Sequence, residues 1–238
     1  MAQVINTNVA ALFAGAALNK SAIGLQTAQQ RLSSGLRINS AADDATGLGI
    51  AAGFDSKIRG ANQNIRKAND GISSAQINDG YLAQIQENTQ RLREIYIQTG
   101  AVTNDESVAL LAENARLDGL VTANTAITVD EAGGTAGGYG TTFTAATAFS
   151  NLAAFDTELA AIVAARSDQG ATISALSSAV ASLQTAVVNY SASYSRVMDT
   201  DYAAETAAQA RNNILQQAGT AVLAQANQNP NTVLTLLR

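Results

Sequence analysis

One stretch, from Leu152 to Val197, most constrains the fold, because its large apolar residues recur at alternating steps of three and four. These residues are Leu152, Phe155, Leu159, Ile162, Ile173, Leu176, Val180, Leu183, Val187, Tyr190, Tyr194 and Val197. Arg166 and Gln169 are the polar members of the stripe, and no proline interrupts it. The pattern is typical of a helix seam. A continuous helix over the stretch is about 70 Å long at ~1.5 Å per residue. Burying each Leu, Ile or Val is worth roughly 1.5–3 kcal/mol, so the seam needs long partners, from this chain or from other copies of it.

The charge balance and the missing residue types exclude several kinds of function. Lys and Arg number 14 against 19 Asp and Glu, a net charge of −5, which argues against a nucleic-acid partner. The sequence has no Cys and no His, so zinc sites built from them, thiol nucleophiles and Ser-His-Asp triads are excluded. The start, MAQVINTNVAALF, lacks the basic region and apolar core of a cleavable signal peptide. No apolar run reaches ~18 residues, so no membrane insertion is expected.

The two ends of the chain, Met1–Asn19 and Asn212–Leu237, carry no charged side chain. A terminal helix in water normally keeps charge on its wet face. The apolar stripes of the ends are Leu18, Leu25 and Leu32, spaced by seven, and Ile214, Leu215, Ala218 and Val222. Frayed tails are the alternative interpretation, but their apolar residues would not be spaced so regularly. We therefore expect two terminal helices that wait for a partner.

A second long helix is expected to begin near Asp44 or Ala45. The preceding segment, Asn39–Gly49, contains turn and N-cap residues, among them the adjacent Asp43 and Asp44. A metal or acid–base site is the alternative for this pair, but no third ligand lies nearby, so capping is favoured. The helix carries Ile58, Ile65 and Ile72, with Ala61, Ala68 and Ala75 between them, then Leu82, Ile85, Leu92 and Ile95 to about Gln98. Gly100 then ends it as a C-cap.

This helix and the 152–197 helix have similar lengths, so they are natural antiparallel partners. The layer of alanines allows the partner to come close. We expect the core of this helical pair to contain Ile58, Ile65, Ile72, Leu176, Val180, Leu183 and Val187.

The middle of the chain changes pattern. A shorter helix begins at Asn104 or Asp105, and Ile127–Val129 and Thr141–Phe143 are β-type fragments that flank EAGGTAGGYG. A Gly-rich loop can hold phosphate, but no GK[ST] follows and there is no strand–loop–helix frame, so a hairpin tip is favoured. The tip glycines are Gly133, Gly134, Gly137, Gly138 and Gly140. After a polar break, Asp199 and Asp201 are expected to cap a final helix from Tyr202 onward.

The predicted fold is therefore mainly α: a long antiparallel helical bundle or coiled coil with a small β-hairpin region, and terminal helices that lie side by side. No catalytic, cofactor-binding or metal site is predicted, and we expect a protein that is not an enzyme.

Three blocks of this sequence resemble bacterial flagellin. They are MAQVINTNVAAL, RLSSGLRINSAADDATGLGIA with NDGISSAQ, and SRVMDTDYAAETAAQARNNILQQAGTAVLAQANQNPNTVLTLLR. The segment RSDQGA also resembles the family pattern. The resemblance covers roughly 1–100 and 150–238, and it indicates a short form that lacks most of the variable central domains.

The resemblance implies a structural subunit of the bacterial flagellar filament, self-assembling into a helical tube for motility. Residues 1–33 and 203–238 would form an inner coiled-coil domain, 34–46 and 196–202 connecting spokes, and 47–195 an outer helical domain with 125–149 as a small β/loop segment. The inner contacts would include Leu18, Leu25, Leu32, Ile214, Leu215, Val222, Leu234 and Leu237. The implied partners are other copies of the chain, an export chaperone at the C-terminal helix, and cap and hook-junction proteins. The implied location is extracellular, reached by type III export.

The resemblance also implies a candidate receptor-facing segment. The family segment recognised by the flagellin-sensing Toll-like receptor resembles Gln90–Gln98, with Arg91, Arg93, Glu94 and Ile95 as the candidate residues. Tyr96 and Ile97 replace the usual small-plus-aliphatic pair, and Gly119 stands where receptor-activating members tend to carry Glu. These departures predict weak recognition.

Two other readings of the sequence remain open. A hook–filament junction protein shares the terminal-helix plan, although its end blocks match less well. A coiled-coil binding adaptor is the second, from a different functional class.

Overall fold

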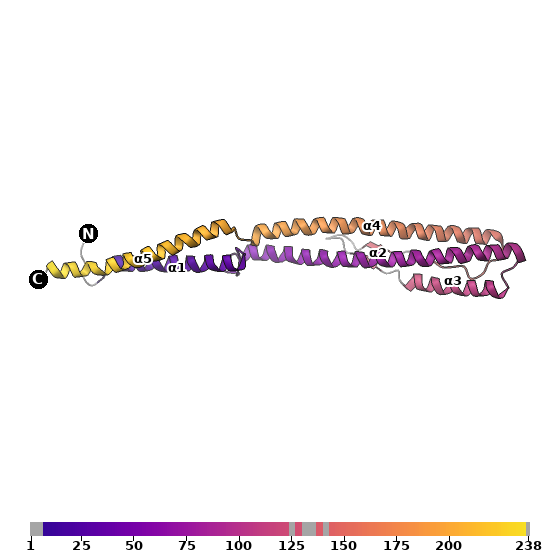
Figure 1. The fold of residues 1–238 in the computed structure, drawn as a ribbon, viewed down its shortest axis with the longest axis horizontal. Helices are drawn as coiled ribbons and strands as arrows, with labels where there is room; N and C mark the ends of the chain where they lie inside the picture. Colours follow the sequence, from indigo (N-terminus) through magenta and orange to yellow (C-terminus); the bar gives the residue numbers. More distant parts are fainter. Residues whose placement is uncertain (1–6, 124–126, 130–136, 140–142, 237–238) are drawn as a thin grey trace. The chain divides into compact units, whose positions relative to one another are not determined.

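A computed structural model describes residues 7–123, 127–129, 137–139 and 143–236, with side-chain burial given for 7–123 and 143–228. The described part is mainly α-helical. Its elements, in chain order, are α1 (Val9–Ser34), α2 (Ala45–Thr99), α3 (Asp105–Ala123), β1 (Ile127–Val129), β2 (Gly137–Tyr139), α4 (Leu152–Met198) and α5 (Tyr202–Leu236). Figure 1 shows them along the chain. The chain divides into two compact units, one of Met1–Phe54 with Ala192–Arg238 and the other of Asp55–Ser191.

The helices begin and end where short polar side chains and glycines stop the helical pattern. The amide of Gly47 donates to Asp44 Oδ1 (2.8 Å) and the amide of Ala203 to Asp201 Oδ1 (2.9 Å), so both predicted caps are confirmed. Asp199 does not cap α5; its carboxylate accepts the Ser195 hydroxyl at 2.6 Å, because the chain turns before it reaches the helix start. The predicted role of Asp199 is therefore wrong.

Two glycines end helices in a left-handed conformation. Gly35 follows α1 with φ of 71°, and Gly100 follows α2 with φ of 69°. Side chains are strained in this region and glycine is not, so both positions suit a C-cap. The predicted end of the second helix at Gly100 is confirmed.

Within Asp55–Ser191, α2 and α4 pair in antiparallel fashion. Lys57 lies over the ring of Tyr190, 5.5 Å from its centroid, while Arg166 binds Asp79 further along α2. The heptad-spaced alanines Ala61, Ala68 and Ala75 are buried. Ala68 packs with Leu176, flanked by Ile72 and Val180. The predicted alanine layer is confirmed.

Large side chains on α2 and α4 lie along the predicted seam, but they are buried to different extents. Leu176 and Leu183 are buried as expected. The other predicted core residues are only partly buried: Ile58, Ile65, Ile72, Val180 and Val187. Leu152, which we placed on the seam, is 39% exposed. It is the first residue of α4, where the helix has not yet met its partner, so that expectation is wrong.

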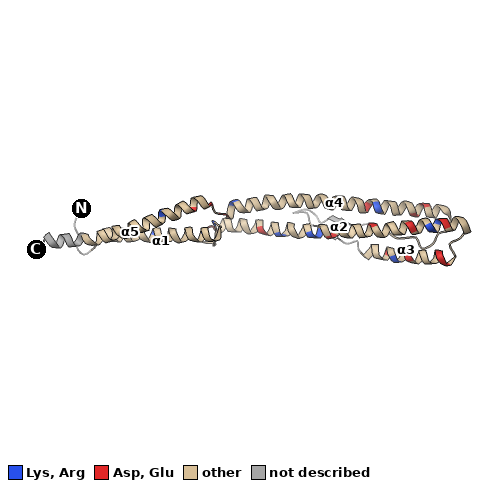
Figure 2. Ribbon diagram, viewed as in Figure 1, with Lys and Arg blue, Asp and Glu red and all other residues tan. Residues whose placement is uncertain are grey.

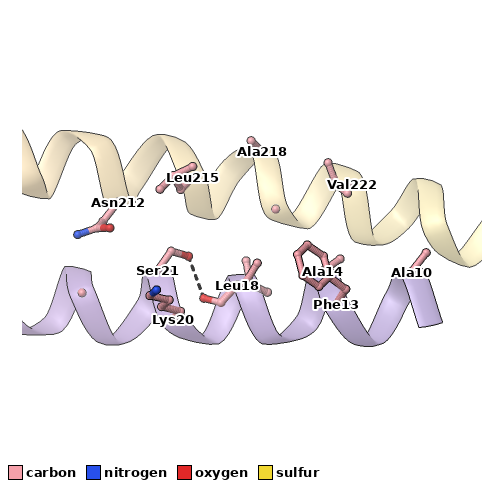
Figure 3. Close-up of a pocket in the computed structure, with 13 residues that line it drawn as sticks. Ala10, Phe13, Ala14, Leu18, Lys20, Ser21, Asn212, Leu215, Ala218 and Val222 are labelled. Carbon is pink, nitrogen blue, oxygen red and sulfur yellow. Dashed lines mark hydrogen bonds between the residues drawn. The ribbon is translucent and has the colours of Figure 1, made fainter. Parts of the chain in front are cut away.

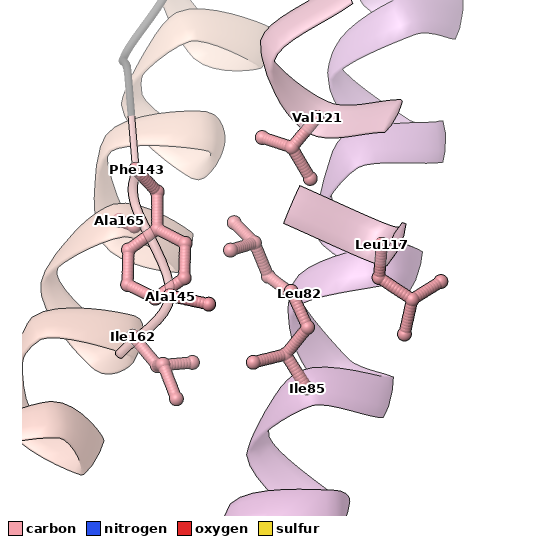
Figure 4. Close-up of a cluster of buried hydrophobic side chains, with 8 residues drawn as sticks. All are labelled: Leu82, Ile85, Leu117, Val121, Phe143, Ala145, Ile162 and Ala165. Atoms are coloured by element: carbon pink, nitrogen blue, oxygen red, sulfur yellow. The ribbon is translucent and has the colours of Figure 1, made fainter. Parts of the chain in front are cut away.

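The main core of this unit lies where α3 joins α2 and α4 (Figure 4). Its buried members are Leu82, Ile85, Leu117, Val121, Phe143, Ala145, Ile162 and Ala165. A second cluster surrounds Leu92, Phe149 and Phe155, in which the two phenylalanine rings stack with centroids 4.1 Å apart. Unit Asp55–Ser191 thus contains two clusters of large apolar side chains that are buried within the unit.

A layer of buried amides joins α2 to α3. Asn88 Nδ2 donates to Asn114 Oδ1 at 2.9 Å, and Asn114 Nδ2 donates to the Thr89 hydroxyl at 3.4 Å. Thr89 Oγ1 donates onward to the carbonyl of Ile85. Because a buried amide without a partner costs roughly 1–3 kcal/mol, this network holds α3 in one register on α2.

Strands β1 and β2 pair antiparallel, with Ile127 opposite Tyr139 and Val129 opposite Gly137. The second strand was expected at Thr141–Phe143 but lies at Gly137–Tyr139, so Gly137 and Gly138 belong to a strand and not to a tip. Phe143 is outside the strand because its ring is buried in the helical core. The other predicted tip glycines, Gly133, Gly134 and Gly140, lie outside the described residues, as do Thr141 and Thr142.

By length and composition α4 contains a stretch long and apolar enough for a membrane span, with a mean hydropathy of 1.4. A core helix passes the same test. Within Asp55–Ser191 its apolar side chains Phe155, Ile162 and Leu176 are buried against neighbouring segments of the chain. Of the apolar stretch itself, 17% is buried within the chain.

The buried seam predicts a large effect for Leu183→Ala. Leu183 is 2% exposed, and truncating a buried leucine removes its transfer energy and leaves a cavity, which destabilises by about 2–5 kcal/mol. Val188→Ala is the matched control, because Val188 lies on the same helix and is 67% exposed. Urea denaturation followed by circular dichroism measures both. Equal, small losses for the two variants would contradict the assignment of this seam.

Candidate functional site

The terminal helices α1 and α5 pair in antiparallel fashion within unit Met1–Phe54 with Ala192–Arg238 (Figure 1). Near one end of the pair, Tyr202 Oη donates to the carbonyl of Leu32 at 2.9 Å. Near the other, Asn8 Nδ2 donates to the carbonyl of Ala226 at 2.8 Å. The pairing predicted for the terminal helices is thus present in the single chain.

Small side chains form the contact between these helices. The buried positions of α1 are Ala14, Ser21 and Ala28, spaced by seven, and Ala226 is buried on α5. A Cβ added at Gly24 would lie 2.9 Å from Asn212 Nδ2, and one added at Gly219 would lie 3.0 Å from Leu18 Cδ1. The side chains of Asn212 and Leu18 therefore pack directly over the two glycines.

Close packing of small residues leaves an apolar groove along the pair (Figure 3). Its volume is about 770 Å³. Figure 3 shows Leu18 and Phe13 from α1 beside Val222 and Leu215 from α5. The lining consists of Ala10, Phe13, Ala14, Ala17, Leu18, Lys20, Ser21, Gly24, Asn212, Leu215, Ala218, Gly219 and Val222.

Large apolar side chains continue from this groove over the exposed surface of both helices. Phe13 is 78% exposed. The other exposed members on α1 and α5 are Val9, Leu12, Ile23, Tyr202, Ile214, Leu215 and Val222. We call the exposed apolar residues of α1 and α5, together with the groove, the terminal apolar surface. A soluble monomer rarely exposes so many large apolar side chains in one region, so this surface indicates a binding face.

Few charges interrupt the terminal apolar surface. The charged residues of the two helices are Lys20, Arg31, Glu205 and Arg211, and Figure 2 shows both ribbons almost entirely tan. Arg31 Nη1 lies 3.7 Å from Glu205 Oε2, the only ion pair between α1 and α5 among the described residues. Burying an uncharged surface avoids the several kcal/mol that each unpaired ion would cost.

The polar segment before α2 and the polar segment before α5 are hydrogen-bonded to each other within the same unit. The amide of Arg37 donates to the carbonyl of Met198 at 2.6 Å, and the amide of Thr200 donates to the carbonyl of Gly35 at 3.0 Å. Ile38 and Met198 are buried there, with Leu36 and Tyr194 against them.

Asp43 stabilises the turn in the polar segment before α2. Its Oδ2 accepts hydrogen bonds from the amides of Asn39 and Ser40, at 3.0 and 2.9 Å. These bonds favour the carboxylate and hold the pKa of Asp43 below its ordinary value. Sequence analysis treated both breaks as connectors and missed the buried Ile38 and Met198. The signal available was the alternation of Leu36 and Ile38 with polar residues.

The structure separates the predicted contact residues of the terminal helices into two groups. Leu18, Leu25 and Leu32 are half-buried, since the deeper positions of α1 are taken by small residues. Ile214, Leu215 and Val222 are exposed. The side chains of Leu234 and Leu237 lie outside the described residues.

The candidate receptor-facing residues on α2 are mostly paired within the chain. Arg91 bonds to Glu94 and Glu106, at 3.0 and 2.9 Å, and these carboxylates raise its pKa. Arg93 lies 3.3 Å from Asp156. Ile95 is 3% exposed, so its side chain packs in the core and cannot face a receptor. Ile95 is buried because the α2 seam extends through this segment.

Comparison with known protein families matches both helical regions. The bacterial flagellin N-terminal helical region matches residues 5–128, and the bacterial flagellin C-terminal helical region matches residues 152–237. The chain belongs to the bacterial flagellin family.

Flagellins of two genera are similar to this chain over part of their length. Flagellin of Salmonella rubislaw is 54% identical over 107 residues, which is 45% of this chain and 22% of that protein. Phase 2 flagellin of Salmonella typhimurium is 54% identical over 107 residues, 45% of this chain and 21% of that protein. Flagellin of Escherichia coli strain K12 is 52% identical over 107 residues, again 45% of this chain and 22% of that protein. The aligned region spans about a fifth of the length of these relatives.

The geometry of this flagellin-family chain predicts one specific cross-link. Gly24 faces Asn212 at close range, and the chain has no Cys of its own. Gly24→Cys combined with Asn212→Cys should therefore form a disulfide readily on mild oxidation, since Asn212 Cγ, which takes the place of a cysteine sulfur, lies 3.2 Å from a Cβ built at Gly24. Gel mobility and mass spectrometry of the monomer measure it.

Gly24→Cys with Asn213→Cys is the matched control, because Asn213 is exposed and one position away. Equal yields from the two pairs would show that α1 and α5 are not held in this register in solution.

Proposed function

We propose that the chain is a structural subunit of the bacterial flagellar filament, which polymerises into a helical tube for motility. The observation that carries this proposal is the terminal apolar surface on α1 and α5, which the single chain leaves uncovered. Its membership of the flagellin family, whose curated relatives bear the name flagellin, supports the same function.

Other copies of the chain are the occupant that suits this surface. A patch that binds a different patch on the next copy generates an open helical polymer. The helices α1 and α5 present apolar side chains outside their own contact, so each copy offers a surface for neighbours on more than one side. Each exposed leucine or phenylalanine that becomes buried on assembly contributes roughly 1.5–3 kcal/mol.

We extend the proposal to the arrangement of the filament. Residues 1–33 and 203–238 form the inner wall, 34–46 and 196–202 connect it to the outer layer, and 47–195 form that layer, with 125–149 as a small β and loop segment. The uncharged inner helices keep Gln and Asn for hydrogen bonding along a tube wall. A polar, uncharged lumen suits the passage of further subunits.

The same proposal includes export and its partners. The chain is secreted outside the cell through the flagellar type III apparatus, with an export chaperone at the C-terminal helix and cap and hook-junction proteins at the growing end. The absence of Cys supports this, because a chain that passes unfolded through a channel must not be cross-linked. The fully apolar stripe of Ile214, Leu215 and Val222 is a surface that a chaperone would cover.

Substitution at the terminal apolar surface tests the assembly function. Phe13→Gln should leave the monomer folded, because the ring is 78% exposed and contributes little within the chain. It should raise the critical concentration for filament growth roughly tenfold or more, since about 1.4 kcal/mol corresponds to a factor of ten. Seeded polymerisation followed by electron microscopy and sedimentation measures the effect.

Phe13→Leu is the matched control, which keeps an apolar side chain and should polymerise nearly as well as the parent. Normal growth of Phe13→Gln would show that this surface is not the contact between copies. Failure of the parent chain to form long filaments even with seeds would favour a junction protein or an adaptor over a filament subunit.

A further inference from the structure

Charge is distributed unevenly along unit Asp55–Ser191. In α2, residues 55–78 carry two lysines and two arginines against two aspartates. Residues 169–191 of α4 have no charged side chain. The two stretches lie side by side, because α2 and α4 are antiparallel and Lys57 lies over the ring of Tyr190. We call them together the basic segment, and its net charge is +2.

The other helical parts of this unit have the opposite charge. Residues 79–99 of α2, all of α3 and residues 152–168 of α4 together carry ten Asp and Glu against four Arg, a net charge of −6. These parts pack on one another in the core around Leu82, Leu117 and Ile162. In Figure 2, red is concentrated on α3 and on the neighbouring parts of α2 and α4. We call them together the acidic segment.

The exposed charges of the two segments are too far apart to neutralise each other within one chain. Lys67 and Glu87 both lie on the continuous helix α2, 20 residues apart. At ~1.5 Å per residue this separation is about 30 Å. Salt screens exposed charges beyond about 8 Å at physiological ionic strength. The opposite charges of the two segments therefore remain available to a partner.

Ion pairs within the acidic segment leave exposed acids without a cation. All four arginines of the segment bind acids of the same segment: Arg91 binds Glu94 and Glu106, Arg93 binds Asp156, Arg116 binds Glu113, and Arg166 binds Asp79. Glu87, Asp105 and Asp168 are exposed, and none of them has an ion pair among the described residues. These three acids are therefore the charges that the segment offers to a partner.

The basic segment likewise keeps exposed cations. Arg59 pairs with Asp55 at 2.8 Å, so these two charges cancel. Arg66 is exposed, and its Nη2 donates to the side-chain oxygen of Gln63 at 2.6 Å, which is not a carboxylate. Lys67 is exposed as well, and it has no ion pair in the part of the chain that the structure describes. Two adjacent cations are therefore open to an acidic partner.

We propose that the basic segment of one copy binds the acidic segment of the next copy, so that units Asp55–Ser191 associate head to tail. This inference rests on the proposed function, because it names a contact between subunits outside the terminal apolar surface. A second copy suits both segments, since every chain carries one of each and their charges are complementary. A contact between two different patches continues into an open polymer. Complementary charges also steer the encounter, so they favour one orientation of the incoming subunit.

Charge reversal in the full chain tests the proposal. One variant, Arg66→Glu with Lys67→Glu, turns the two exposed cations into acids, and a second, Glu87→Lys with Asp168→Lys, turns two of the three exposed acids into cations. Each variant alone should have a critical concentration for seeded growth roughly tenfold above that of the parent, because like charges then meet across the contact. An equimolar mixture should polymerise at close to the parent's critical concentration, since each variant offers the charge that the other lacks. Sedimentation and electron microscopy measure all three.

Arg66→Lys with Lys67→Arg is the matched control, which keeps both charges and should polymerise like the parent. Circular dichroism of each variant checks that it is folded. The defect of each reversal variant should shrink between about 0.1 M and about 1 M NaCl, since the screening length falls from about 10 Å to about 3 Å. Parent-like growth of both variants, or a mixture that grows no better than its components, would overturn the proposal while leaving the filament function intact. A parent that forms no filaments would overturn both.

Discussion

Close contact between helices through small side chains determines where this chain buries apolar surface and where it leaves it exposed. The deeply buried heptad positions are Ala14, Ser21 and Ala28 on α1 and Ala61, Ala68 and Ala75 on α2. Such layers allow two backbones to approach, but alanine and serine remove little apolar area from water. Because each Å² of buried apolar surface stabilises by about 25 cal/mol, these layers contribute little free energy. In unit Asp55–Ser191, clusters of large side chains around Leu82, Leu92 and Phe155 bury the apolar area that the small residues do not. Between α1 and α5 no comparable cluster of large side chains is found in the described residues, so Phe13 and Leu215 remain outside.

Polar contacts supply the register that small apolar residues leave undetermined. A heptad of alanines can shift by seven residues with little change in buried area. The Asn88–Asn114 bond on α3 and the Arg166–Asp79 pair on α4 do not tolerate such a shift, because it would leave polar groups without partners. Arg166 also binds Gln86, so one side chain fixes two positions of α2. On α1 and α5 the corresponding contacts are the bonds of Asn8 and Tyr202 near the two ends of the pair.

The sequence predicts the helices well and the tertiary packing only in part. The 152–197 seam matches α4, and Asp44, Gly100 and Asp201 were predicted as helix ends, because capping and periodicity are local properties. Burial depth is not local. The leucines Leu18, Leu25 and Leu32 have the right spacing but lie beside the contact, since a glycine-lined approach favours smaller residues there. Phe143 was predicted in a strand because its residue type suits one, whereas the helical core takes its ring.

The two units therefore differ in how their helices are held together. Unit Asp55–Ser191 has buried clusters of large apolar side chains and a buried amide network formed by its own residues. The pair of α1 and α5 is held by small side chains, few hydrogen bonds and the long contact between Arg31 and Glu205. Most helical stability in proteins comes from tertiary packing of an apolar face, and this pair packs through small side chains. Such limited packing suits the proposed function, in which the ends find further partners in neighbouring copies. Under the proposed function, covering the terminal apolar surface would add the burial of large side chains that the pair of α1 and α5 lacks, so that growth of the polymer would stabilise these ends.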